Sequence, residues 1–173
     1  MKHYLLKIIL LILLLNYSLN AQRKISPTTF FTISGKVISE QIITVKKLDS
    51  FPKKDIKDLI IFNHKGEIKD TIKNVRGVLF KEVFSKTTFT NQKPKNLNEF
   101  YFVCSASDGY KVVFSWNEIF NSEVGNNLYF ITEMDGKSLE DLEQRIILLS
   151  SSDIQNGRRY IKGLEKIEVK QVE

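Results

Sequence analysis

Residues 100–120 read FYFVCSASDGYKVVFSWNEIF, and they contain a strong signal for a β-hairpin. Two runs of aromatic and β-branched residues, which are typical of strands, flank the pair Asp108-Gly109. An Asp-Gly pair satisfies the backbone demands of a tight hairpin turn. Ser115 then stands three residues before Glu118, which is the spacing of a capping box at the start of a helix. The stretch therefore predicts a β-hairpin that runs directly into a short helix over residues 116–121.

The rest of the chain continues this alternation of strands with short helices. Further strands are expected at residues 28–39, 42–48, 59–62, 67–72, 128–132 and 145–149. Gly35 lies within the first of them, where a glycine indicates a bulge or a close approach of another backbone. A helix is expected at 79–84 and the longest loop at 85–98. Because no internal repeat appears, this order predicts the α+β class, with mixed β-sheets and short helices.

The N-terminal residues 1–21 have the order of a secretory signal peptide. Two lysines give a positive start, an unbroken aliphatic run follows at residues 8–15, and the segment then becomes polar and small. The apolar run is too short for a membrane-spanning helix, and no second long apolar stretch follows. We expect cleavage after Ala21 or after Ser18. The mature protein would then be periplasmic or secreted, with no membrane anchor.

The mature chain of about 150 residues suits one domain. We assign that domain to residues 31–173, behind a loose segment at 22–30. The formal charge of +6 becomes milder once Lys2 and Lys7 leave with the signal peptide. An exported, mildly basic domain is not expected to meet nucleic acid, and its charge favours small anionic ligands or an anionic envelope protein as partners.

The order of these pieces resembles the sulfite-oxidase-type molybdopterin-binding domain family. The similarity runs from about residue 31 to residue 169. It involves an opening strand with a central glycine, a glycine-valine entry to a helix, a hairpin followed by a helix, a late arginine strand and a closing strand. These features stand at residues 33–37, 77–84, 108–119, 135–148 and 159–169. The resemblance implies a fold of mixed sheets and short helices.

Two departures from this family bear on activity. Catalytic members hold molybdenum through a cysteine on the strand before the glycine-valine pair, and the corresponding residues 59–73 contain no cysteine. The family also grips the pterin phosphate with histidines and arginines, whereas the mature chain keeps one histidine, His64. We therefore expect no cofactor, as in small stand-alone members, with bound molybdopterin as the alternative.

Cys104 is the only cysteine and the only candidate metal ligand. On strand alternation it shares a face with Phe102 and Ala106, which indicates the core, and no basic residue stands near it to activate the thiol. Free cysteine is among the most buried residue types. We therefore interpret Cys104 as a structural thiol and predict no metal site, and we interpret His64 as a solvated hairpin residue.

Six other residues are candidates for ligand binding. They are Arg145, Arg158, Arg159, Asp108, Tyr110 and Trp116. Arginine offers a planar fork that suits a carboxylate or phosphate, so the three arginines are the better candidates. The alternative interpretation gives Asp108 to the turn and the two aromatic residues to packing. It also pairs the arginines with rim acids at Glu140, Asp141 or Glu143.

Three functions stay open on this evidence. The first is an exported, non-catalytic binding or accessory domain on a sulfite-oxidase-like scaffold, with anion recognition by arginines. The second is a molybdopterin-dependent oxidoreductase with an unusual ligand, for which Cys104 is the candidate. The third is a structural partner in an envelope complex, docked through an edge strand or an aromatic patch. The missing cysteine in residues 59–73 favours the first.

Overall fold

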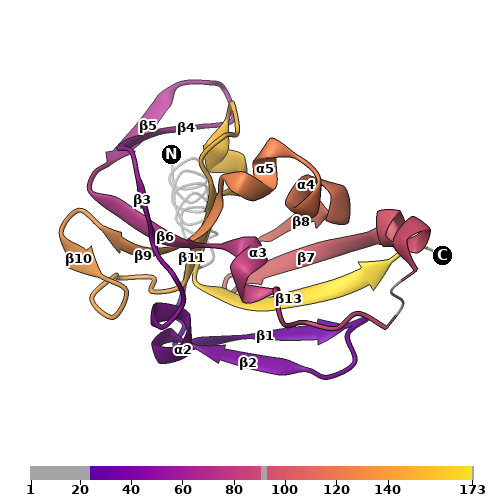
Figure 1. Ribbon diagram of the computed structural model, residues 1–173. Helices are drawn as coiled ribbons and strands as arrows, with labels where there is room; N and C mark the ends of the chain where they lie inside the picture. Colours follow the sequence, from indigo (N-terminus) through magenta and orange to yellow (C-terminus); the bar gives the residue numbers. More distant parts are fainter. Residues whose placement is uncertain (1–23, 91–92, 173) are drawn as a thin grey trace, which may run out of the picture.

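The structure is a computed structural model, and it describes residues 24–90 and 93–172. Two β-sheets pack against each other, and short helices lie between them and at their ends (Figure 1). This architecture of mixed sheets with few, short helices is compatible with the α+β class predicted from the sequence.

The first sheet has five strands in the described part of the chain. In spatial order they are β2 (Gln41–Thr44), β1 (Phe30–Gly35), β13 (Leu164–Gln171), β7 (Phe100–Ala106) and β8 (Lys111–Ser115). β1 and β13 run parallel, and the other neighbours run antiparallel. The first and last strands therefore lie side by side in this sheet (Figure 1).

The second sheet is antiparallel throughout. In spatial order its strands are β12 (Ile161–Lys162), β11 (Ile147–Ser150), β9 (Leu128–Met134), β6 (Val75–Leu79) and β3 (Lys54–Ile56), with β10 (Lys137–Ser138) paired to β9. A separate hairpin of β4 (Leu59–Phe62) and β5 (Ile68–Ile72) stands at the top of Figure 1.

The helices are one or two turns long and connect the strands. They are α2 (Val45–Asp49), α3 (Phe80–Val83), α4 (Trp116–Phe120) and α5 (Glu123–Asn126), with 3-10 turns η1 (Pro94–Glu99) and η2 (Asn156–Arg159). Helices this short are not stable alone, so packing and caps must hold them in place.

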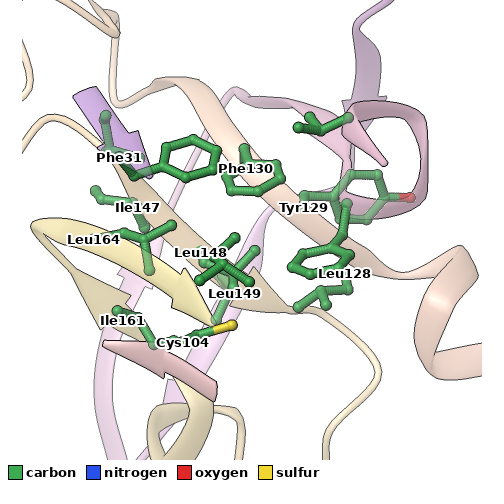
Figure 2. Close-up of a cluster of buried hydrophobic side chains, with 14 of the residues drawn as sticks. Phe31, Cys104, Leu128, Tyr129, Phe130, Ile147, Leu148, Leu149, Ile161 and Leu164 are labelled. Carbon is green, nitrogen blue, oxygen red and sulfur yellow. The ribbon is translucent and has the colours of Figure 1, made fainter. Parts of the chain in front are cut away.

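The core between the sheets is rich in phenylalanine. Phe31 of β1 stacks on Phe130 of β9 with ring centroids 5.1 Å apart, so this pair joins the two sheets (Figure 2). Phe80 of α3 also stacks on Phe130, at 5.6 Å, and meets Phe102 of β7 edge-on at 5.5 Å. All four side chains are fully buried. Each contributes about 1.5–3 kcal/mol through its burial.

The local predictions around the turns are confirmed. Residues 106–111 form the predicted hairpin turn between β7 and β8, where Gly109 has a φ of +82°. Ser115 and Glu118 form the reciprocal capping box of α4. Gly66, also at a φ of +82°, ends the turn between β4 and β5 as predicted.

The strand predicted over residues 42–48 is wrong in its second half, because the strand β2 ends at Thr44 and α2 follows. The Thr44 side chain accepts a hydrogen bond from the Lys47 N–H at 3.1 Å and so caps the helix. Val45 and Leu48 are buried three residues apart, which is a helical spacing. Similarly, residues Pro94–Glu99 of the predicted long loop form η1, which begins at a proline.

Residues 26–30, within the segment expected to be loose, are held against the first sheet. The Ser26 N–H donates to the Ser107 hydroxyl at 2.9 Å, and that hydroxyl donates back to the Ser26 carbonyl at 2.8 Å. Phe30 already belongs to β1. The predicted signal peptide, residues 1–21, lies outside the described residues. Within the described residues, no helix has the length and apolar character needed to cross a membrane.

Gly35 allows β1 to approach β13 closely. Its φ is +91°, and a Cβ at this position would lie 2.2 Å from the Val169 carbonyl oxygen.

Gly136 has a φ of +75°, but a Cβ there would meet nothing within 4 Å. We expect Gly136→Ala to lower the free energy of unfolding by about 1 kcal/mol, the cost of the backbone conformation alone. Gly35→Ala should cost about 3 kcal/mol. Urea unfolding measures both losses, and equal values would contradict the close-approach argument.

Candidate functional site

Cys104 lies in the middle of β7 and is fully buried. Its neighbours across the sheet are Ile167 of β13 and Val112 of β8. Figure 2 shows the Cys104 sulfur within the cluster of buried hydrophobic side chains. This burial raises the pKa of the thiol far above its ordinary value. A neutral, enclosed thiol is a poor nucleophile and a poor metal ligand, because both roles need the thiolate.

The residues present do not fit a molybdenum cofactor held by sulfur. Cys104, the sole cysteine of the sequence, lines no groove. The β4–β5 hairpin, which covers the residues where the resemblance implied a thiolate, has Asn63 and an exposed His64 at its turn. Within residues 24–90 and 93–172, no three His, Cys, Asp or Glu side chains are grouped as a metal site requires. The described chain therefore offers no accessible thiolate to the metal.

Three of the predicted site residues meet at one corner of the molecule. An Asp108 carboxylate oxygen accepts the Tyr110 N–H at 2.9 Å, and the Tyr110 hydroxyl donates to the Arg158 carbonyl. The Arg158 guanidinium donates to the Gln155 side-chain oxygen at 3.0 Å and to the His64 carbonyl at 3.5 Å. These bonds tie the β7–β8 turn, the β4–β5 hairpin and the loop before β12 together, which is a structural task.

Arg159 is committed to two carboxylates of the protein itself. Its guanidinium donates two hydrogen bonds to the Asp153 carboxylate, of 2.5 and 2.6 Å, and one to Glu118 at 2.8 Å. It also lies 4.5 Å from the centroid of the Phe114 ring. Hydrogen bonding to Asp153 raises the pKa of Arg159 above its ordinary value. Arg159 therefore presents no free fork to an external anion.

The partners of Arg159 differ from the rim acids predicted from sequence, which were Glu140, Asp141 and Glu143. Asp153 comes from the loop between β11 and η2, and Glu118 belongs to the capping box of α4. Burial acts to raise the pKa of Glu118, but the Ser115 N–H and Arg159 together hold it below its ordinary value of 4.5. The ion pairs thus fasten the loop to the capped helix.

Trp116 is half-buried in the first turn of α4, and its ring centroid lies 5.0 Å from that of Phe120. This contact places Trp116 in the packing of the helix against the core, which is the simpler of its two sequence interpretations.

Arg145 was expected at the head of a strand, but it precedes β11 and has a φ of +54°. The two other non-glycine residues with positive φ in the described chain are Asn74 and Asp135. Asn and Asp tolerate this conformation, whereas for arginine it costs about 1–2 kcal/mol. The Arg145 N–H closes this turn by donating to the Leu142 carbonyl at 3.0 Å.

Arg145 lines a surface groove of about 570 Å³. Besides Thr29 and Thr44, the lining residues are Phe30, Val45, Lys46, Glu140, Asp141 and Arg145. A parallel bridge between Thr28 and Arg145 brings this turn beside the start of β1. Within the described residues, the side chains of Arg145, Lys46 and Glu140 make no hydrogen bond or ion pair. Arg158 and Arg159 line a second groove, but both donate to protein acceptors there. Of the three predicted arginines, Arg145 alone has a guanidinium without a protein partner in the described chain.

Sequence reasoning missed Phe30 and Lys46 as neighbours of Arg145. Both lie more than 90 positions from Arg145 along the chain, and only the sheet topology brings the three together. The alternation of the strand was a signal for Phe30 in the sequence. Because it buries Phe31 and Ile33, it turns Phe30 outward, and Phe30 is 49% exposed.

Comparisons with known proteins support the fold only. No family model and no curated protein matches this chain. Among solved structures, it is similar to the sulfane dehydrogenase SoxCD from Paracoccus pantotrophus, with a TM-score of 0.56 and 12% sequence identity. The match covers 81% of this chain and 37% of that chain. At this identity the likeness shows a related fold, and the chain spans well under half of that protein's length.

The enclosure of Cys104 predicts its reactivity. We expect no reaction with a thiol reagent such as dithionitrobenzoate in the native protein, and one equivalent after unfolding in guanidinium, because the thiol is buried and its pKa is raised. Free glutathione, assayed under both conditions, is the control for the reagent. Fast labelling of the native protein would show that the thiol is accessible.

The pairing of Arg159 predicts a stability difference between two adjacent arginines. Arg159→Met leaves Asp153, whose side chain is only 13% exposed, without its cation. We expect this to lower the free energy of unfolding by about 2 kcal/mol. Arg158→Met, at an exposed position, should change it by about 0.5 kcal/mol or less. Urea unfolding of both variants is the measurement, and a larger loss for Arg158→Met would refute the assignment.

Proposed function

We propose that this chain is an exported, non-catalytic binding domain on a sulfite-oxidase-like scaffold, and that it recognises a small ligand through an anionic group. The observation that carries the proposal is the position of Cys104. The one thiol of the sequence lies fully buried in the middle of β7, on a fold related to that of a sulfane dehydrogenase.

The redox alternative would require Cys104 to reach a cofactor. Since Cys104 is paired in register with both β8 and β13, bringing its sulfur to the surface would require separating β7 from these neighbours. Such an opening costs most of the stability of a small domain. The geometry therefore favours recognition over electron transfer.

Recognition of an anion is supported at Arg145. The protein neutralises Arg159 with its own carboxylates and uses Arg158 to join loops, whereas Arg145 stands beside a groove without such partners. An unpaired guanidinium at a groove can bind a carboxylate with two hydrogen bonds. Export is supported by the signal-like order of residues 1–21.

Elemental analysis tests the proposal. We expect the mature protein, purified from a host that supplies molybdenum cofactor, to carry much less than one molybdenum atom per chain, because its sulfur is enclosed. Cys104→Ala should fold and should leave the metal content unchanged. Stoichiometric molybdenum that disappears in Cys104→Ala would overturn the proposal. A molybdenum enzyme expressed in the same host is the control for cofactor supply.

A further inference from the structure

The groove beside Arg145 carries charges of both signs around an apolar wall. Lys46 and Arg145 supply two cations, Glu140 and Asp141 supply two anions, and Phe30 supplies an exposed ring. We propose that this groove binds a zwitterion with an apolar body, which is an ammonium and a carboxylate joined to a hydrophobic group. An apolar α-amino acid and a short apolar peptide with free ends share this chemistry. The inference rests on the proposed binding function and names its ligand class.

The cationic side of the groove suits a carboxylate. Arg145 lies in the turn before β11 and Lys46 in the first turn of α2, so the two cations come from separate segments of the chain. Neither is engaged by an acid of the described residues, although Glu140 and Asp141 line the same groove. A ligand carboxylate can therefore take the Arg145 fork without displacing an existing partner.

The anionic side explains why a simple anion is a poorer fit. Glu140 is exposed and makes no hydrogen bond or ion pair within the described chain. Asp141 accepts the Ser138 hydroxyl at 2.6 Å, which fixes its carboxylate in the turn and leaves further acceptor capacity. A ligand that carried only negative charge would meet repulsion from both carboxylates. An ammonium group on the ligand converts this repulsion into attraction.

The apolar residues that line the groove favour an apolar group on the ligand. Phe30 and Val45 belong to neighbouring chain segments, because the Val45 N–H donates to the Thr29 carbonyl at 3.0 Å. Phe30 keeps 49% of its side chain exposed, although the alternating residues Phe31 and Ile33 are fully buried. Covering that ring with an aliphatic or aromatic side chain removes apolar surface from water. The volume of about 570 Å³ is within the usual range for small-molecule sites.

The backbone at Arg145 supplies an independent observation. A residue held at a φ of +54° without being Gly, Asn or Asp is uncommon, and such strain concentrates at functional sites. This turn places Arg145 in the lining of the groove together with Glu140 and Asp141. One short loop therefore supplies one cation and two anions to the same groove.

Isothermal titration calorimetry with four small probes tests the inference. L-leucine and leucyl-leucine carry both charges, N-acetyl-L-leucine lacks the ammonium, and leucinamide lacks the carboxylate. We expect one of the two zwitterions to bind at least tenfold more tightly than either blocked compound. Tighter binding of L-leucine identifies the amino acid as the ligand class, and tighter binding of leucyl-leucine identifies the peptide.

Variants assign the two ends of the ligand. Arg145→Asn, chosen because Asn tolerates positive φ, should weaken zwitterion binding at least tenfold and leave leucinamide binding unchanged. Glu140→Gln should weaken zwitterion binding and leave N-acetyl-L-leucine binding unchanged. Arg158→Gln, which alters an arginine outside the groove, is the matched control and should bind like the parent protein. Should Arg145→Asn not fold, Lys46→Gln, at an exposed position, replaces it with the same expected direction.

Two results would overturn the inference. In the first, N-acetyl-L-leucine binds as tightly as the zwitterions or more tightly, and Arg145→Asn abolishes this binding. That result would show an anion site without zwitterion selectivity, and the proposed function would stand. Absence of binding by all four probes, or binding insensitive to both groove variants, would remove this ligand class while leaving the molybdenum analysis to decide the proposed function separately.

Discussion

The contact between Phe31 and Phe130 is the interaction on which the structure depends most. It joins the two sheets, because Phe31 belongs to β1 of one sheet and Phe130 to β9 of the other. Phe80 extends the stack from α3, so the packing of an aromatic side chain stabilises a helix of one turn that would not be stable alone. Close packing of these rings requires both sheets to present their inner faces in a single register.

That register places Cys104 on the buried face of β7, and this position constrains the function. A shift of β7 by one residue would turn Cys104 to the outer face and bury Val103 in its place. The shift would also turn Phe102 out of the aromatic cluster, where it meets Phe80 and Phe84 edge-on. The aromatic core therefore holds the thiol inside. A redox role for this sulfur conflicts with the packing that stabilises the sheet.

The features predicted correctly from sequence are local ones. The β7–β8 turn and the capping box of α4 are determined by residues within four positions of each other, so their spacing carries the information. The helix α2 was missed because Val45 favours strands by propensity, while the Thr44 cap and the burial of Leu48 favour a helix. Residue type identified the arginines as candidates, but their partners come from distant positions. Asp153 belongs to an irregular loop with no periodic signal that would place it against α4.

The three arginines show how a fold separates structural charge from available charge. Arg159 is enclosed by two carboxylates and a ring, and its attraction to them is strengthened by partial burial, so the pair serves stability. Arg145 is placed beside Glu140 and Asp141 by its turn but is bonded to neither. Charged side chains that line one groove without pairing with one another can each pair with a charged group of a ligand. Because both signs are present, the ligand that gains most from this groove is one that also carries both.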